Sequence, residues 1–276
     1  MMTAITRIQE LQQEWALQYK GRTKFTDYQD NLFEELKSDA KNEYASGDGQ
    51  ELTNHMYSLI SSSALCCNFF HYWRYHNPSE LCQALSIKGN VLRFSFEEQP
   101  QKPEGIPGNN PNIDVIIASD DGELTAIECK FTEPFQSRGP DVHASKPLAK
   151  SYFGSGISIW QTIPRSRDLA RRLPYVTEGG VPFHHLAADQ LLKHAVGLLN
   201  TYPKKNWRLV YLWYDDGSVV AENLRIELER FMEAIGDDFR FEHVTYQGLF
   251  SRLCEEQDAR KSRWANYMRR RYFSVL

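Results

Sequence analysis

The apolar residues of this chain recur with a helical period near the N-terminus and with a strand period in the middle. Spacings of three and four residues predict two helices within residues 4–46, the second over Phe25–Leu36, and then a long helix from Gln50 to about Tyr72. Alternating apolar and polar residues predict a strand at Val91–Phe96. The later elements expected are helices near Gln161–Leu173, His184–Leu199 and Ala221–Ile235 and strands at Trp207–Tyr214 and Phe239–Thr245.

A β-hairpin is the strongest local prediction. Two β-branched segments, Asn112–Ser119 and Leu124–Phe131, flank the turn-forming residues Asp120–Glu123. A three-residue loop closed by Gly122 in the left-handed conformation would fix the register so that paired residue numbers sum to 242. Both faces of these strands are otherwise apolar, so we expect central strands covered by helices on both sides.

This register decides whether the charged residues of the hairpin meet. It places Asp114 opposite Glu128 and puts Lys130 on the same face, within about 8 Å of Asp114. A loop one residue shorter or longer would instead place Asp114 opposite Cys129, on the wrong face. The register therefore predicts one cluster of two carboxylates and an ammonium group.

Two readings of this cluster are open. On a solvated hairpin end, Asp114 and Lys130 would form an ordinary ion pair worth under about 1 kcal/mol. At a buried sheet end, the two carboxylates would be costly to desolvate unless a cation or a specific network offset their charge. Oxygen ligands on rigid strands suit Mg²⁺, with Mn²⁺ as a substitute, and a lysine beside the metal could position or deprotonate an attacking water. The apolar flanking sequence favours the buried site.

The residues that form this cluster also resemble a known motif. Pro111-Asn112-Ile113-Asp114 and, after thirteen residues, Glu128-Cys129-Lys130 resemble the PD-(D/E)xK motif of the restriction-endonuclease-like nucleases, although Asn-Ile stands between Pro and Asp. The elements predicted between about residues 50 and 245 are similar to the α-β-β-β-α-β core of that superfamily. A weaker likeness to a bacterial group of restriction endonucleases lies in Glu128–Phe135, Ser61–Asn68 and Gln190–Ala195.

The resemblance implies a fold and a set of roles. The fold would be α/β, with a central mixed sheet flanked by helices and an N-terminal helical extension. Asp114 and Glu128 would be metal ligands, joined by the backbone carbonyl of Cys129, and Lys130 would act on the nucleophilic water. The Cys129 side chain should point to the opposite face and belong to the core.

Helices supply further candidates. Many superfamily members add an acidic residue from the first core helix, here Glu51, although the polar stripe that begins there could equally face water. Gln190 and His194 lie four residues apart on one helix face, where they either reach substrate phosphate or form a solvated rim. Glu97 and Glu98, at the end of the first strand, are lesser candidates that are more typical of loop charges.

Composition limits the classes of protein to consider. The chain has 276 residues, a net charge of −4 and a pI near 6.1, which argues against binding nucleic acid by bulk charge alone. Its five cysteines are an odd number without C-x-x-C spacing, so neither a disulfide framework nor a zinc ribbon is supported. No apolar run approaches the roughly 18 residues of a membrane span. We expect a cytoplasmic protein with reduced thiols.

Local basic segments remain as candidate DNA contacts. One is the C-terminal segment, where a helix with a solvated basic face would explain the same composition. A second basic cluster falls in the predicted helix near Gln161–Leu173. The C-terminal segment contains Arg260, Lys261, Arg263, Arg269, Arg270 and Arg271 interleaved with Trp264, Tyr267, Tyr272 and Phe273, and the second cluster contains Arg165, Arg167, Arg171 and Arg172.

The predicted organisation and function follow from these features. We expect a helical extension (residues 1–48), a nuclease-like domain (49–250) and a basic-aromatic C-terminal segment (251–276). The resemblance implies a Mg²⁺-dependent DNA nuclease, and more specifically an endonuclease that leaves 5′-phosphates. DNA would be its partner, and a homodimer is one assembly to consider. The alternative is a nuclease-fold module that binds DNA or protein without cleavage. No motif supports a small-molecule enzyme.

Overall fold

A five-stranded mixed sheet forms the centre of the computed structural model, which describes residues 3–47, 50–104, 106, 108–136, 159–173, 183–204, 206–254 and 259–273. The strands are β1 (Val91–Glu98), β2 (Ile113–Ser119), β3 (Glu123–Lys130), β4 (Asn206–Trp213) and β5 (Arg240–Thr245), and they lie in this order across the sheet. The β1–β2 and β2–β3 pairs are antiparallel, and the β3–β4 and β4–β5 pairs are parallel. This is the mixed sheet expected from the resemblance.

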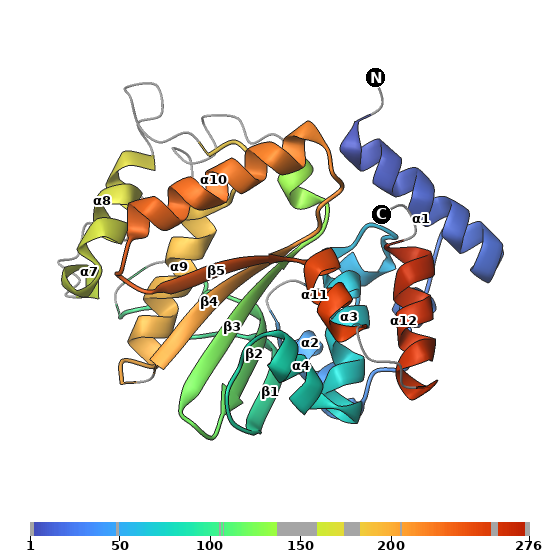
Figure 1. Cartoon of the computed structure of the whole chain (residues 1–276), viewed down its shortest axis with the longest axis horizontal. Helices are drawn as coiled ribbons and strands as arrows, with labels where there is room; N and C mark the ends of the chain where they lie inside the picture. The colour runs from blue at the N-terminus through green and yellow to red at the C-terminus, as the bar shows by residue number, and fades with distance from the viewer. Residues whose placement is uncertain are drawn as a thin grey trace.

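Helices cover both faces of the sheet (Figure 1). Helices α9 and α10 pack on the face that carries Glu128, whereas α3, α4 and α11 pack on the other face. The described α-helices are α1 (Ala4–Lys20), α2 (Ser38–Ser46), α3 (Ser62–His76), α4 (Pro78–Ala84), α7 (Ile159–Thr162), α8 (Pro164–Arg172), α9 (Ala188–Thr201), α10 (Val219–Ile235), α11 (Tyr246–Leu253) and α12 (Ala259–Arg271). The described short 3₁₀ helices are η1 (Tyr28–Asn31), η2 (His55–Tyr57) and η3 (Glu133–Phe135).

The predicted hairpin and its register are confirmed. Gly122 has a φ of 87°, and its N–H donates to the Ser119 carbonyl at 3.1 Å, which closes the turn. Across β2 and β3, Val115 pairs with Ile127, and the pairing continues in this register to the turn. Local turn chemistry therefore sets which side chains share a face.

The predicted long helix from Gln50 is wrong in its first half. Helix α3 begins only at Ser62, where the Ser61 side chain accepts a hydrogen bond from the Ala64 N–H. The preceding residues form turns and the short η2 helix, after Gln50 in the left-handed region with a φ of 52°. Serine side chains cap helix starts, and within a helix their hydroxyl groups compete for the backbone hydrogen bonds. The serine-rich segment at residues 61–63 therefore starts a helix instead of continuing one.

The helix expected over Phe25–Leu36 is also wrong, because only η1 forms there. The Asp27 side chain accepts from the Gln29 N–H and starts this short helix. The Asn31 amide then donates to the carbonyls of Met56 and Ser58, at 2.7 and 2.8 Å. These long-range bonds hold the segment in an irregular conformation that periodicity does not reveal.

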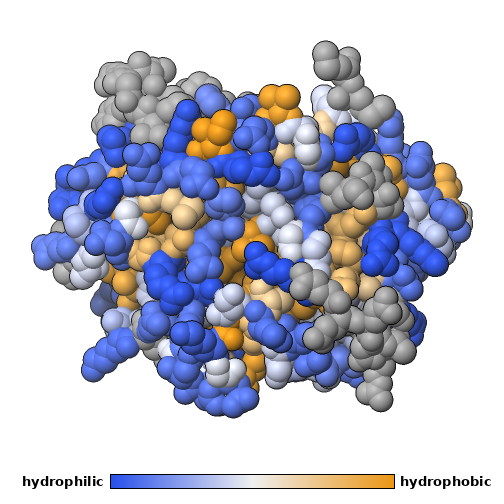
Figure 2. Space-filling model, in the orientation of Figure 1, coloured by the Kyte–Doolittle hydropathy of each residue, from blue (hydrophilic) through white to orange (hydrophobic). Residues whose placement is uncertain are grey.

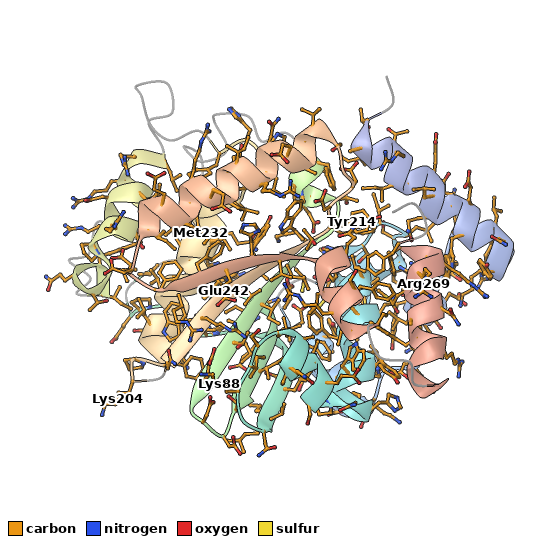
Figure 3. All side chains as sticks on the ribbon, viewed as in Figure 1. Lys88, Lys204, Tyr214, Met232, Glu242 and Arg269 are labelled. Carbon is orange, nitrogen blue, oxygen red and sulfur yellow. The ribbon has the colours of Figure 1, made fainter. Side chains whose placement is uncertain are left out.

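The hydrophobic core extends from Ile8 to Phe273 along the chain, and side chains fill the space between the sheet and its helices (Figure 3). Tyr214, just after β4, shows how the C-terminus joins this core: its ring packs edge-on against Phe131, and its hydroxyl donates to the Tyr272 carbonyl at 2.6 Å. The surface in Figure 2 is mostly hydrophilic, with apolar side chains in small separate groups. Among the described helices, none has the length and apolarity needed to cross a bilayer.

Aromatic residues of the C-terminal segment belong to the core, so they are not available to stack on bases in the candidate DNA contact predicted there. Trp264 is fully buried and packs against Phe69 and Trp73 of α3, and Tyr272 and Phe273 are also buried. Aromatic spacing on a basic helix is equally typical of a helix that packs its apolar face, and the structure has that arrangement. The side chains of Arg260 and Lys261 lie outside the described part of the chain.

Candidate active site

The structure brings Asp114, Glu128 and Lys130 together at one end of the sheet. The regular β2–β3 pairing ends at Val115 and Ile127, and Asp114 and Glu128 come one position further on. There the Cys129 N–H donates a hydrogen bond to Asp114 Oδ2 at 2.6 Å, so the Asp114 side chain satisfies this backbone donor. Lys130 Nζ lies 2.6 Å from Glu128 Oε1. The cluster that the register predicted is therefore present.

The Glu128 carboxylate lies between two basic side chains. It is only 1% exposed, and besides Lys130 it approaches His194, whose Nε2 lies 3.0 Å from Glu128 Oε2. Within the described residues, neither this oxygen nor either ring nitrogen of His194 forms an aligned hydrogen bond. Buried polar atoms without a hydrogen bond are uncommon in folded proteins and often mark functional sites.

Opposing effects set the charge of this ion pair. Burial would raise the pKa of Glu128, but Lys130 and His194 outweigh it and lower that pKa to about 2. Burial would lower the pKa of Lys130, yet the carboxylates of Glu128, Glu133 and Asp114 raise it above its ordinary value. Glu128 and Lys130 are therefore both charged near neutral pH.

A third carboxylate completes a row across three strands. Phe96 pairs with Val115 and Glu98 with Ile113, which places Glu97 beside Asp114. Glu97 is buried, has a φ of 52°, and accepts a hydrogen bond from the Asn112 side chain. The row runs from Glu97 through Asp114 to Glu128.

Burial and nearby negative charge raise the pKa values of two carboxyl groups in this row. Burial and then the charge of Glu51 raise the pKa of Glu97 to about 8. Burial and the Glu128 carboxylate likewise raise the pKa of Asp114 well above its ordinary value. Glu97, ranked below Glu51 from sequence, is thus a buried member of the site, and the β1–β2 register is the signal that would have identified it.

Glu51 lies near the site but for a different reason than predicted. It precedes α3 and is not part of a helix, so the proposed helical stripe does not exist. Its carboxylate is buried, accepts a hydrogen bond from the Ser63 hydroxyl and lies 3.3 Å from His55 Nδ1. Its charge acts on Glu97, which places it at the β1 side of the row.

Three further predicted positions have different outcomes. The Cys129 thiol is buried in the core, as expected for the face opposite Glu128. Gln190 is half-buried and lies one turn before His194 on α9, so its role at the site stays a prediction. Glu98 forms an ion pair with Arg93 and belongs to a separate surface group.

Sequence reasoning missed Glu133, which lies three residues after Lys130. One oxygen of its carboxylate accepts from the Ser62 hydroxyl at the start of α3, and the other accepts from the Phe131 N–H at 2.9 Å. Its charge helps to raise the pKa of Lys130. The sequence after the Glu-x-Lys tripeptide does not identify Glu133 as a site residue, because the position of its side chain depends on the short 3₁₀ helix that starts there.

A glycine lets α9 approach the start of the motif closely. A Cβ atom at Gly197 would lie 2.3 Å from Pro111 Cγ, well inside van der Waals contact. Gly197 follows His194 by three residues on the same helix. The absent side chain therefore brings the helix that carries His194 against the residue that leads into β2.

The oxygen ligands of the site suit magnesium better than a metal ion that needs three or more protein side chains. In the described ranges, no three His, Cys, Asp or Glu side chains are placed to hold a metal ion together. Magnesium is often bound through only one or two carboxylates and keeps several waters. Asp114 and Glu128 supply two such groups from adjacent strands, and Glu128 Oε2 has no aligned hydrogen bond. The residues present therefore fit a magnesium ion.

Comparison with known proteins agrees with this geometry. A family model described as "Restriction Endonuclease associating with ARP" matches residues 10–273. No curated protein matches the chain, and no solved structure matches it. The family match covers the sheet, all the candidate site residues and most of the terminal helices.

Proposed function

This chain belongs to the family of restriction endonucleases associating with ARP, and from that premise we propose that it is a magnesium-dependent DNA endonuclease. Its reaction would be hydrolysis of a phosphodiester bond by water. The single observation that carries the proposal is the convergence of Asp114, Glu128 and Lys130 at one sheet end, with the Lys130 and Glu128 side chains 2.6 Å apart. The family description also names an association with ARP, which we propose as the partner of this chain.

We assign the metal to the carboxylates of Asp114 and Glu128 and the backbone carbonyl of Cys129, with Mn²⁺ as a substitute for Mg²⁺. When bound, the ion would polarise a phosphoryl oxygen and lower the pKa of an associated water. Asp114 and Glu128 lie on paired strands, so their relative position is held by the sheet and needs little reorganisation when DNA binds.

Lys130 and His194 would act on either side of the Glu128 carboxylate. Lys130, held at 2.6 Å from Glu128, orients the attacking water and offsets the negative charge that develops at phosphorus. His194, 3.0 Å from the other oxygen, would place a second basic group beside the carboxylate. The Glu133 carboxylate, which accepts a hydrogen bond from Ser62, adds negative charge that favours the charged form of the lysine, and Glu97 accepts a hydrogen bond from Asn112 of the motif.

The alternative function is a nuclease-fold module that binds DNA or protein and does not cleave. The contacts of Lys130 and His194 with the Glu128 carboxylate favour this alternative, because they already surround the carboxylate with basic side chains. Against it, two adjacent buried carboxylates cost stability that a pure binding module has no reason to lose.

Plasmid nicking separates the two functions. Supercoiled plasmid is incubated with Mg²⁺ and wild type, the Lys130→Ala variant, or Lys88→Ala as a matched control at an exposed lysine away from the cluster. We expect nicked and linear DNA with wild type and Lys88→Ala and intact plasmid with Lys130→Ala. Equal DNA binding by all three without cleavage would establish the module, and nicking that persists in Lys130→Ala would reject the assigned site.

A further inference from the structure

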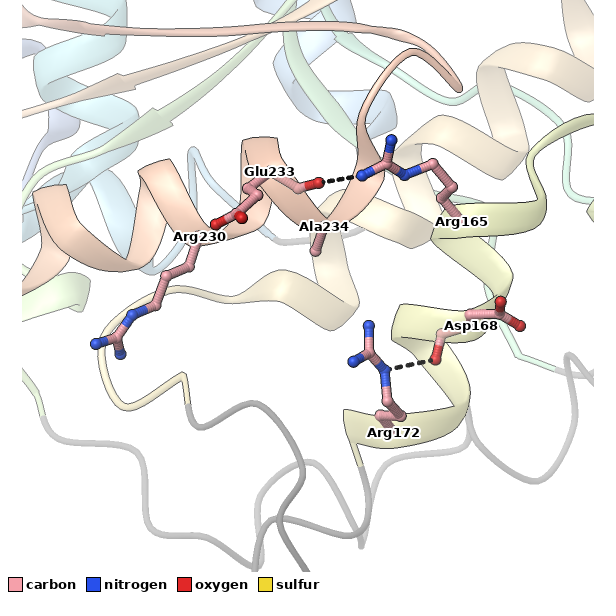
Figure 4. A pocket seen from close by; sticks show the side chains of 6 residues that line it. All are labelled: Arg165, Asp168, Arg172, Arg230, Glu233 and Ala234. Carbon is pink, nitrogen blue, oxygen red and sulfur yellow. Dashed lines mark hydrogen bonds between the residues drawn. The ribbon is translucent and has the colours of Figure 1, made fainter.

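A basic groove between α8 and α10 lies apart from the candidate active site (Figure 4). Its volume is about 450 Å³. It is lined by Arg165, Asp168 and Arg172 from α8 and by Arg230, Glu233 and Ala234 from α10. Two of the arginines belong to the basic cluster singled out in the sequence.

The groove and the active site lie at opposite ends of the sheet. The groove is near the C-terminal end of α10, which is followed by the start of β5. Arg240 at that start lies 3.4 Å from Glu123, the first residue of β3, whereas Lys130 is the last residue of that strand. A strand of this length spans about 23 Å, so the two sites are separated by roughly that distance along the sheet.

The arginines of the groove keep their positive charge available. Arg165 donates to the Glu233 carbonyl at 2.7 Å, and the Arg172 Nε–H donates to the Asp168 carbonyl at 3.3 Å. These acceptors are neutral backbone groups. Across the described ranges, no ion pair with a carboxylate involves Arg165, Arg172 or Arg230, whereas Arg22, Arg74, Arg93, Arg208, Arg225 and Arg240 all form one.

The lining of the groove identifies the chemistry of its ligand. Among the described residues that line it, Ala234 is the only apolar one and none is aromatic, so these residues offer a nucleobase or other planar ring nothing to stack on. Guanidinium groups match phosphate oxygens in charge and in geometry. The ligand is therefore a phosphate group whose attached base stays outside.

The spacing of the arginines suits a polymer of phosphates. Arg165 and Arg172 are seven residues apart, or about 10 Å along the helix axis. Successive phosphates of one DNA strand advance by about 3.4 Å along the duplex axis, so the two arginines span about three steps. On the premise of the proposed nuclease function, we propose that the α8–α10 groove binds the sugar-phosphate backbone of DNA outside the cleavage site.

The arginines of α12 are less suited to this role. The guanidinium groups of Arg263, Arg269 and Arg270 each lie over an aromatic ring of the protein, 5.6 to 5.8 Å from its centre. Arg271 is buried and fully engaged. An acidic protein with a charge of −4 that binds DNA needs a local positive surface, and the groove supplies one.

DNA binding measured without cleavage tests the groove. The probe is a labelled duplex of about 30 base pairs and arbitrary sequence, followed by fluorescence anisotropy in Ca²⁺ in place of Mg²⁺, from about 50 to 200 mM salt. For the Arg172→Glu/Arg230→Glu variant we expect binding about tenfold weaker and a salt slope smaller by about two. Arg22→Glu/Lys24→Glu, with the same change in net charge at exposed positions after α1, is the control and should bind nearly as wild type.

Each outcome decides the proposal. Equal losses in the two double variants would show a net-charge effect and overturn it, as would unchanged binding by Arg172→Glu/Arg230→Glu or no binding by wild type. Plasmid cleavage at saturating DNA should keep the wild-type rate, because the groove is remote from Asp114. Binding that depends on the groove in a protein that does not cleave would reject the nuclease function and leave the groove in place.

Discussion

Two clusters of buried charged groups in this protein differ in how completely their polar atoms are paired. Arg271, on α12, is 2% exposed, and Glu128, on β3, is 1% exposed. The Arg271 guanidinium donates to Gln12, to Asn31 and to the Tyr267 hydroxyl, and it lies 4.2 Å from the centre of the Trp15 ring. Around Glu128, by contrast, one carboxylate oxygen and both His194 nitrogens lack an aligned hydrogen bond.

The comparison separates a stabilising use of buried charge from a functional one. A buried cation with all its neighbours paired fixes the packing of the elements that surround it. A row of like charges with unpaired atoms weakens the fold, and such sites persist where chemistry or ligand binding needs them. The difference in pairing thus predicts opposite effects of mutation: loss of activity at Glu128 and loss of stability at Arg271.

The largest expected effect is on cleavage. Asp114→Asn and Glu128→Gln each remove the charge of a metal ligand and should lower the cleavage rate by about 10²- to 10⁴-fold. Both should still fold: Asp114→Asn relieves repulsion from Glu128, whereas Glu128→Gln also removes the charged partner of Lys130 and should lose some stability. Plasmid cleavage, calorimetric titration with Mn²⁺ and thermal unfolding would be measured together. A variant with normal cleavage and weakened folding would reverse the assignment.

The second effect is on stability, at the other cluster. Arg271→Met leaves the acceptors of Asn31 and Gln12 buried without a donor, so we expect a loss of about 3–5 kcal/mol in the free energy of unfolding. Urea denaturation measures it, and Arg270→Met, at an exposed neighbour, is the control. A loss below about 1 kcal/mol would show that the pairing contributes little.

A third substitution connects packing with the site. Gly197→Ala would force α9 and Pro111 apart, and overpacking of this kind costs about 1–3 kcal/mol. Because His194 lies on the same helix, cleavage should fall as well, although Gly197 touches no reacting group. Unfolding and cleavage assays on the same samples would show both losses. Retention of full activity would indicate that the position of α9 is unimportant to Glu128.

The smallest expected effect concerns the hydrogen-bonded pair of Glu34 and His71. The Lys37 N–H donates to His71 Nε2, so the His71 Nδ1 proton is the one directed to Glu34 at 2.7 Å. Burial would raise the pKa of Glu34, but its contacts with His71 and His76 outweigh it and lower the pKa below the ordinary value.

A carboxyl group with a lowered pKa stabilises the fold above its unfolded pKa, near 4.5, and this contribution disappears as the pH falls through the folded value. Glu34→Gln should therefore be less stable than wild type by under about 1 kcal/mol at pH 7 and equal to it near pH 3. Urea denaturation across this range measures the difference. A gap that widens toward low pH would contradict the assigned direction.

The parts of the site that were predictable depend on short-range chemistry. The turn closed by Gly122 sets the β2–β3 register, and Asp114, Glu128 and Lys130 follow from it by strand alternation. The position of Glu97 depends on the pairing of β1 with β2, which are joined by a long loop. The β1 strand also contains an irregularity after Val91, so the β1–β2 register could not be counted from a turn.

The errors in the predicted helices come from side-chain hydrogen bonds, long-range at Asn31 and local at Ser61, which override the periodic pattern. Asn31 and Ser61 form side-chain bonds that end or replace helices where periodicity predicts them. Trp264 and its aromatic neighbours follow a spacing that fits a core face and a stacking surface equally well. Helix composition alone does not indicate which face of a helix is covered.

The Arg271 cluster also constrains how the protein forms during synthesis. Gln12 and Arg271 are separated by 259 positions in the chain, so the hydrogen bonds between α1 and α12 can form only after all the residues between them have been synthesised. Contacts of such high sequence separation form late and slowly. Trp15 and Ala16 pack with Phe25 and Leu59, which follow them closely in the chain, whereas the contact of the Trp15 ring with Arg271 can form only once α12 has been made.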